Sequence, residues 1–390
     1  MPQVARFIGW SGLLLLLGGC SLFGAKDNAD PPAELVDFKP TLEVETLWHA
    51  GVAGSDGRYL ALRPLYHQGR LFLADHKGRV VALDPASGKT LWRVDTGLPL
   101  SGGPGAAGEL LLLGTEEAEL VALTQEKGEQ RWRRRVSSEV LSSPAGEAGV
   151  AVVRSADGRV IGVNSSNGET RWFFDRSVPV LTLRGNSSPL VRDGRVFIGF
   201  ANGKLACLEL DSGTQVWETP IATPRGRTEL ERVVDIDADP VLVEEVIYSA
   251  SFHGGVAAVS EASGVVLWKR KLSSHAGLDA DWRQVYLSDN QDHIWSLDAN
   301  NGASLWQQKM LHARGISAPA IVGDYLVVGD RQGYLHWFAQ EDGHLVARTH
   351  VSGEPIRIKP LVVDGVVYVF DDGGRLTALR PKLPKPPKPE

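Results

Sequence analysis

The chain has 390 residues, of which 43% are hydrophobic and 23% charged, with 43 glycines and 11 tryptophans. This composition is typical of a turn-rich folded protein and excludes a disordered or collagen-like chain. The formal net charge of −6 gives no indication of a basic surface that binds nucleic acid or an anionic membrane. Any membrane contact therefore requires a means of attachment other than charge.

The first twenty residues carry the pattern of a secretory signal. Arg6 precedes an apolar run over residues 7–17, and two glycines lead into Cys20. The run is shorter than the roughly 20 residues of a transmembrane helix, so we interpret residues 1–19 as a signal peptide that is removed. The alternative is a plain secreted protein in which Cys20 occurs by chance.

The four residues Leu-Gly-Gly-Cys that end at Cys20 resemble the lipobox of bacterial lipoproteins. The resemblance implies that the Cys20 thiol receives a diacylglyceryl group and that the new N-terminal amine is acylated. Ser21 stands where inner-membrane lipoproteins of enterobacteria have Asp, which implies the outer membrane and its periplasmic side. Residues 20–40, rich in Asp, Pro and Ala, are predicted to be a flexible tether.

The body of the chain, residues 41–380, repeats one unit. A copy has an apolar alternation that ends in Ala-Leu-Asp or a related triplet, then a turn that ends in Gly, with Trp four residues after the Gly. The seventh copy has Ala347 in place of Trp, and Trp48 ends a copy whose beginning is missing. The tryptophans at this position are Trp48, Trp92, Trp132, Trp172, Trp217, Trp268 and Trp306. From Trp92 onward they are spaced 38 to 51 residues apart, the period of a propeller blade. We expect them to pack against the neighbouring blade; the alternative is stacking on a substrate.

The two ends of this body complete each other. The last copy starts at Pro360 and runs out before its fourth strand, whereas residues 44–48 have the ending of a copy without its beginning. We therefore predict an all-β, eight-bladed propeller with four antiparallel strands per blade, whose last blade is closed by the N-terminal strand. Residues 381–390, which alternate Pro and Lys, are predicted to be a disordered tail.

Two connections between blades are longer than the others. They hold 16 residues between Trp172 and Pro189 and 22 residues between Trp217 and Pro240. Because such connections emerge on one face of a propeller, we expect them to lie side by side and to form a binding surface. The side chains in them that suit a protein partner are Leu181, Leu183, Arg184, Asp235 and Asp237. The alternative is that the leucines fill the core between blades and the charges tie the loops together.

No motif for catalysis, a cofactor or a metal holds up. Residues 103–108 match GxGxxG, but a strand-like run follows them instead of a helix, so we expect a loop there. Asp235 and Asp237 begin like a calcium loop, but Pro240 stands where that loop requires Gly. We therefore predict a protein without catalytic residues, cofactor or metal.

The repeat Ala-Leu-Asp-x-x-(Ser/Asn)-Gly-x-x-x-Trp resembles the tryptophan-docking motif of quinoprotein-type propellers, which include the pyrroloquinoline-quinone dehydrogenases and the BamB family. The lipobox, residues 181–185 (Leu-Thr-Leu-Arg-Gly), 235–237 (Asp-Ile-Asp) and 329–337 are more similar to BamB. This resemblance covers essentially the whole chain. It implies a scaffold lipoprotein of the outer-membrane β-barrel assembly (BAM) machinery that assists the insertion of β-barrel precursors.

The same resemblance implies that the residues matching the family's docking segments bind the periplasmic domains of BamA. These are Leu181, Leu183, Arg184, Asp235 and Asp237. Two other functions stay open: a quinone-dependent dehydrogenase-like propeller and a periplasmic propeller for an unrelated protein. The first lacks a typical feature, because with Cys20 lipidated only Cys207 remains and the adjacent-cysteine disulfide of quinone dehydrogenases cannot form.

Overall fold

The computed structural model describes residues 30–51, 61–176, 178–179, 181–182 and 187–382. These residues form strands and turns, with one short 3-10 helix, Leu230–Arg232. In this part of the chain no helix is long and apolar enough to span a membrane.

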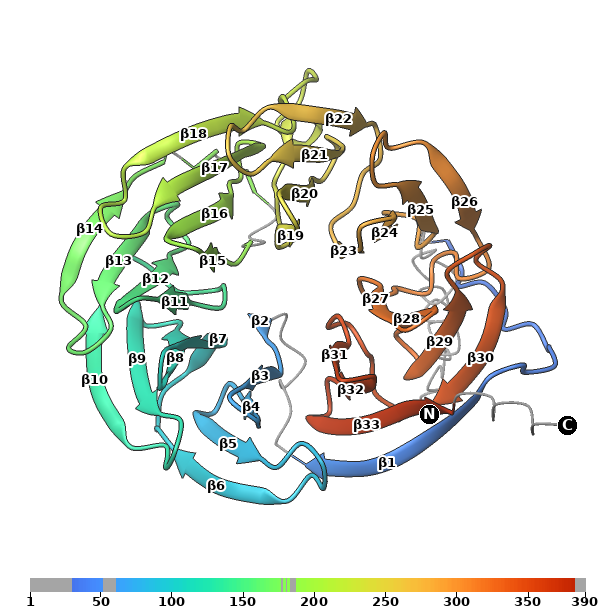
Figure 1. Cartoon of the computed structure of the whole chain (residues 1–390), viewed down its shortest axis with the longest axis horizontal. Coiled ribbons are helices and arrows are strands. Elements are labelled where there is room, and N and C mark those ends of the chain that lie inside the picture. The colour runs from blue at the N-terminus through green and yellow to red at the C-terminus, as the bar shows by residue number, and fades with distance from the viewer. Residues whose placement is uncertain (1–29, 52–60, 177, 180, 183–186, 383–390) are drawn as a thin grey trace, which may run out of the picture.

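Eight four-stranded antiparallel units surround a central axis (Figure 1). Six are separate sheets, and two are joined into one larger sheet by a parallel contact between β7 and β11. Blade 1 consists of β3 (Leu65–His67), β4 (Arg70–Ala74), β5 (Arg79–Leu83) and β6 (Thr90–Asp95), and blade 2 of β7 (Leu100–Ala107), β8 (Leu110–Thr115), β9 (Glu119–Thr124) and β10 (Gln130–Arg135). Blade 3 consists of β11 (Ala145–Glu147), β12 (Val150–Arg154), β13 (Val160–Asn164) and β14 (Thr170–Phe174), and blade 4 of β15 (Leu190–Arg192), β16 (Arg195–Gly199), β17 (Lys204–Glu209) and β18 (Gln215–Pro220).

Blades 5 to 8 repeat the arrangement. Blade 5 consists of β19 (Val241–Val243), β20 (Val246–Ala250), β21 (Val256–Ser260) and β22 (Val266–Arg270), and blade 6 of β23 (Gly277–Ala280), β24 (Gln284–Ser288), β25 (Ile294–Asp298) and β26 (Ser304–Gln308). Blade 7 consists of β27 (Ala320–Val322), β28 (Tyr325–Gly329), β29 (Tyr334–Ala339) and β30 (Leu345–His350), and blade 8 of β31 (Leu361–Val363), β32 (Val366–Phe370), β33 (Arg375–Lys382) and β1 (Glu43–Gly51). A further short strand, β2 (Ala61–Leu62), pairs with β7.

The N-terminal strand closes the ring, as predicted. β1 pairs antiparallel with β33, with Val44 opposite Pro381 and Trp48 opposite Ala378. The last blade therefore combines both ends of the described chain, and its outer strand comes from the N-terminal side. Strand β33 continues to Lys382, two residues into the segment predicted as a tail.

Each of the seven tryptophans reaches the next blade. Trp217 donates its indole N–H to the Glu261 carbonyl at 2.9 Å, and its ring covers Gly264, where φ is +71° and a Cβ would lie 2.6 Å from Trp217 Cδ2. The other indoles donate in the same way: Trp48 to Pro85, Trp92 to Gln125, Trp132 to Ser165, Trp172 to Leu210, Trp268 to Ala299 and Trp306 to Gln340. Only glycine accepts both this backbone conformation and the close ring, so the Gly–Trp spacing joins consecutive blades.

A β-bulge precedes the tryptophan in these outer strands. In β22 the pairing with β21 shifts between Ala258 and Val259, which leaves Leu267 unpaired and 53% exposed. A bulge re-aims the following side chain, so Trp268 turns inward onto the next blade.

The core lies between the blades. The second and third strands of a blade are buried on both faces, as in β4 and β5, because each blade is packed between two neighbours. The hydrophobic clusters accordingly combine adjacent blades; one joins Phe72 and Val80 of blade 1 with Leu111 and Val121 of blade 2. Residues 103–107, expected in a loop, belong instead to β7. Gly105 is required there because a Cβ would lie 1.7 Å from the Pro144 carbonyl oxygen.

Candidate functional site

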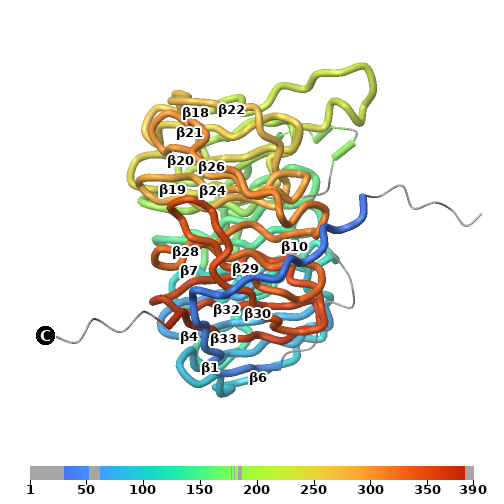
Figure 2. The backbone as a smooth tube through the Cα atoms, turned by 90° about the vertical axis from the view of Figure 1, so that its right-hand side faces the viewer, coloured from blue at the N-terminus to red at the C-terminus, as the bar shows by residue number. Residues whose placement is uncertain are grey.

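The two long connections lie next to each other around blade 4. One joins β14 to β15 and the other joins β18 to β19. They meet where the Ser188 N–H donates to Asp239 Oδ1 at 2.7 Å. The Ile236 N–H donates to the Phe200 carbonyl at 3.2 Å, which ties the second connection to a turn of blade 4. Its outer part, which includes Leu230–Arg232, projects from one face of the ring (Figure 2).

The residues expected to bind a partner occupy three environments. Leu181 lies at the surface and is 41% exposed. Asp235 is fully buried, so its carboxylate serves the interior of the loop, while Asp237 lies between interior and surface. Leu183 and Arg184 lie outside the described residues.

Arg154 is the residue of this site that the sequence reasoning missed. It ends β12, is only 3% exposed, and donates from Nη1 to the Ser187 carbonyl at 3.4 Å. Its guanidinium carbon lies 5.5 Å from the centroid of the Phe200 ring, a cation–π distance. Arg154 thus touches the first connection and blade 4 from the blade before them.

A comparison of the blades could have revealed Arg154. The second strands of the eight blades end in Ala74, Thr115, Arg154, Gly199, Ala250, Ser288, Gly329 and Phe370. Seven of these residues are small or uncharged, so an arginine at the end of a buried strand marks a place where opposite charge must be near.

That opposite charge comes from the second connection. Burial lowers the pKa of Arg154 to about 10, against the opposing charges of Asp237, Asp235 and Asp239. Burial also raises the pKa of Asp237 to about 7, helped by the charge of Asp235 and opposed by Arg154. Asp237 Oδ1 is buried and has no hydrogen-bond partner among the residues that the structure describes. The site therefore holds a carboxyl group that titrates near neutral pH and has an unused acceptor.

Asp239 anchors the β18–β19 connection at a second point. Its carboxylate forms an ion pair with Arg63, which follows β2 and donates its N–H to the Gly103 carbonyl of blade 2, whereas Asp239 precedes blade 5. Figure 1 shows β2 displaced towards the centre of the ring. The ion pair thus links the second connection to a segment that pairs with blade 2, and Arg63 and Ser188 together hold Asp239.

The charged side chains of the site are paired with one another. The three aspartates face arginines, and within the described ranges no group of three or more His, Cys, Asp or Glu side chains is placed to hold a metal ion. What the site presents is an exposed leucine beside a loop that two arginines and a serine N–H hold from within.

The ring of Trp–Gly-docked blades defines a quinoprotein-type β-propeller. The family model for "Outer membrane protein assembly factor BamB" matches residues 76–308 and 294–382. A relative of that name from Alkalilimnicola ehrlichii is 50% identical over 94% of each chain, and one from Pseudomonas aeruginosa is 46% identical over 95% of this chain and 99% of its own. The chain belongs to the BamB family of outer membrane protein assembly factors.

Solved structures agree with the fold. The crystal structure of BamB from Moraxella catarrhalis matches 87% of this chain and 100% of its own, with a TM-score of 0.80 and 24% identity. The quinohemoprotein alcohol dehydrogenase from Comamonas testosteroni also matches, with a TM-score of 0.62 and 11% identity over 88% of this chain and 78% of its own. At such identities the likeness shows the propeller fold alone.

Proposed function

We propose that this chain is a non-enzymatic scaffold lipoprotein of the BAM machinery, anchored by Cys20 on the periplasmic side of the outer membrane. It binds the periplasmic domains of BamA through the surface formed by Leu181, Leu183, Arg184 and Asp237, with Asp235 buried beneath it, and it assists the assembly of β-barrel precursors. Membership of the BamB family supports the role. The observation that supports the surface is the pair of adjoining connections, with Leu181 exposed on one and Asp239 of the other held by the Ser188 N–H.

Within this surface the residues have different tasks. An apolar side chain such as Leu181 contributes when a partner covers it. Asp237 is partly exposed and offers a partner its carboxylate, whereas buried Asp235 keeps the loop in shape. A donor that the partner brings to this carboxylate forms a charge-assisted hydrogen bond.

The test is affinity purification of the lipidated protein from its own envelope in mild detergent. Leu181→Asp is expected to lower the yield of co-purified BamA at least tenfold, because it places a charge in an apolar contact. The matched control is Leu305→Asp, which changes a leucine of similar exposure (50%) on the outer strand β26. Equal loss in both variants, or no loss in Leu181→Asp, would reject this surface.

The same purification separates the other functions. Another stoichiometric partner in place of BamA would indicate an unrelated binding propeller, and quinone absorbance in the purified protein would indicate a dehydrogenase-like one. The anchor is tested by mass spectrometry of the mature N-terminus. Cys20→Ser should abolish acylation and membrane retention, while Cys207→Ser, at the buried cysteine, should leave both unchanged.

A further inference from the structure

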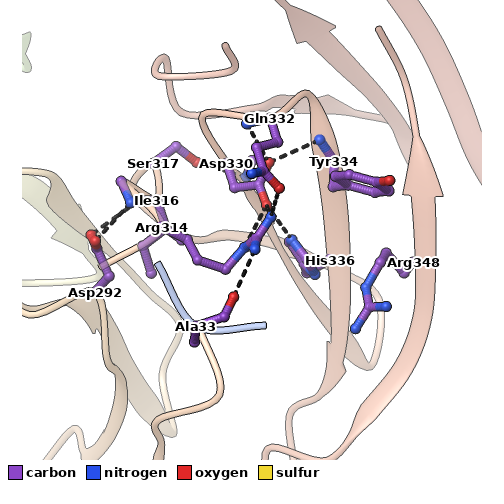
Figure 3. Close-up of polar contacts among 12 residues, drawn as sticks. Ala33, Asp292, Arg314, Ile316, Ser317, Asp330, Gln332, Tyr334, His336 and Arg348 are labelled. Carbon is purple, nitrogen blue, oxygen red and sulfur yellow. Dashed lines mark hydrogen bonds and ion pairs between the residues drawn. The ribbon is translucent and has the colours of Figure 1, made fainter. Parts of the chain in front are cut away.

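Residues 30–42 lie along blade 7 in a row of contacts. The Ala33 N–H donates to the His312 carbonyl at 2.9 Å, and Arg314 Nη1 donates to the Ala33 carbonyl at 2.8 Å. Figure 3 shows Arg314 between that carbonyl and Asp330. A predicted flexible tether would need no such partners, so we treat this segment as a strap.

The strap is held again further along. Arg348 of β30 donates from Nη1 to the Val36 carbonyl at 3.1 Å, and its guanidinium carbon lies 5.2 Å from the centroid of the Phe38 ring. Beyond it, the Leu42 N–H donates to the Val346 carbonyl at 3.1 Å. Contacts at several points fix the direction of the segment, which a single contact cannot do.

The end of the strap fills a seam that lacks the usual tryptophan. Blade 7 has Ala347 at the position where the other outer strands have Trp. Leu42, only 6% exposed, packs there with Ala347, Val367 and Leu379. The packing between blades 7 and 8 therefore depends on an N-terminal residue, and burial of Leu42 stabilises the attachment of the strap.

The anchoring point is a buried charged cluster. Arg314 donates from Nε and Nη2 to Asp330 Oδ2 at 2.9 and 2.7 Å, and His336 Nε2 lies 2.9 Å from the same oxygen. Burial acts to raise the pKa of Asp330, but hydrogen bonds from His336, the Tyr334 N–H and Arg314 lower it overall. Burial lowers the pKa of His336, against the opposing charge of Asp330. The cluster is therefore one carboxylate with one guanidinium, which also donates from Nη2 to Gln332 and from Nη1 to the strap.

This anchoring point lies on the face that carries the candidate site. Arg314 is in the connection from β26 to β27, and Asp330 is in the turn from β28 to β29. In a four-stranded blade both of these segments emerge on the same face as the connections β14–β15 and β18–β19. Figure 2 shows the N-terminal segment running to the side from which the loop around Leu230–Arg232 projects.

We propose that residues 30–42 are a fixed strap that sets where the chain leaves the propeller towards Cys20, so that the face with the two long connections is held close to the lipid leaflet. This inference rests on the lipid anchor of the proposed function. From Cys20 to Asp30 the chain spans at most about 35 Å, whereas from Cys20 to a detached segment ending at Leu42 it spans up to roughly 75 Å. For a flexible leash this lengthening dilutes the loop face near the membrane about threefold.

The test compares the lipidated protein with a strap-release variant, Ala33→Pro/Arg348→Gln. Proline removes the N–H that bonds to His312, and glutamine removes the guanidinium over Phe38, while the Arg314–Asp330 pair stays intact. The matched control is Arg270→Gln, because Arg270 lies on the outer strand β22 and contacts Ser304 instead of the strap. Spin labels at Glu34→Cys and Glu341→Cys should give one narrow distance distribution in the parent and the control, and a broad one after release.

A second measurement uses vesicles of phosphatidylethanolamine and phosphatidylglycerol that contain a rhodamine-labelled lipid. Energy transfer from a fluorophore at Glu229→Cys, on the loop face, should exceed that from Glu109→Cys, on the β7–β8 turn of the opposite face, and release should reduce this difference at least twofold. Equal transfer from the two faces in the parent, or an unchanged difference after release, would overturn the strap. Failure of the parent to bind vesicles would overturn the lipid anchor itself, which separates the two proposals.

Discussion

Asp237→Asn is expected to stabilise the free propeller and to weaken partner binding. Burial and the charge of Asp235 raise the pKa of Asp237 from 3.8 to about 7, with Arg154 opposing. The folded state therefore favours the protonated carboxyl group. The contribution of this group to stability is full below about pH 4 and is lost as the pH rises through about 7.

The magnitude follows from the two pKa values. At about 1.4 kcal/mol per pH unit, the difference between 3.8 and about 7 corresponds to about 4 kcal/mol that ionised Asp237 costs at pH 8. Asparagine has nearly the same shape and cannot ionise. Asp237→Asn should therefore raise the free energy of unfolding at pH 8 by up to about 4 kcal/mol and change it by less than about 1 kcal/mol at pH 4.

The assay is urea unfolding of the propeller at pH 4, 6 and 8, beside titration with the periplasmic domains of BamA. Asp211→Asn is the matched control, because that carboxylate is 84% exposed, and its unfolding curves should follow the parent at every pH. Binding of Asp237→Asn should weaken about tenfold at pH 8, since a charged acceptor becomes neutral. A lower stability at pH 8, or the same pH dependence as the parent, would refute the account of this buried carboxyl group.

Three further predictions concern the blades. Gly264→Ala should lower the free energy of unfolding by about 1–3 kcal/mol more than Gly194→Ala, because both have positive φ but only Gly264 faces the ring of Trp217; equal losses in urea would contradict this. Trp217→Phe should cost about 1–3 kcal/mol in the same assay, since the Glu261 carbonyl loses the indole donor and keeps only the longer contact from Arg195, and an unchanged midpoint would argue against the docking role. Burial raises the pKa of the Cys207 thiol to about 12, so the folded protein at pH 8 should not react with a thiol reagent until urea unfolds it; fast reaction of folded protein would show the thiol exposed.

The ring could be predicted because nearly every sequence repeat contains both residues of the contact between blades, the turn glycine and the tryptophan. The turn glycine and the tryptophan recur at fixed spacing, and the structure joins the Trp of one copy to the Gly of the next, as with Trp268 and Gly302. The closure by Val44–Trp48 followed from an ending without a beginning, and pairing of β1 with β33 confirms it. Repetition allows non-local contacts to be predicted from the sequence, because the same contact joins each pair of neighbouring blades.

The side-chain contacts of the candidate site were harder to predict from the sequence, because each of them occurs only once in the chain. Burial of Asp235 depends on Ile236, which packs where a Cβ at Gly199 would lie 2.3 Å from Ile236 Cγ2. Arg154 approaches from the preceding blade, about eighty positions away in the sequence. No local pattern encodes such contacts, so the sequence indicated which connections are long but not which of their side chains face inward. The strap was hidden for the same reason, since a segment rich in Pro and Asp resembles a linker.

The propeller separates the contacts that make it stable from the connections that can vary. The seven tryptophan seams are made in the outer strands, whereas the long connections lie on one face of the ring. Extending a connection from about 13 residues to the 22 between Trp217 and Pro240 costs about 0.5 kcal/mol in loop-closure entropy. One hydrogen bond contributes about 1 kcal/mol, so the Ser188–Asp239 contact alone offsets that cost. A repeat of this kind can therefore gain a docking loop without weakening its ring, provided that each added loop brings its own internal partner.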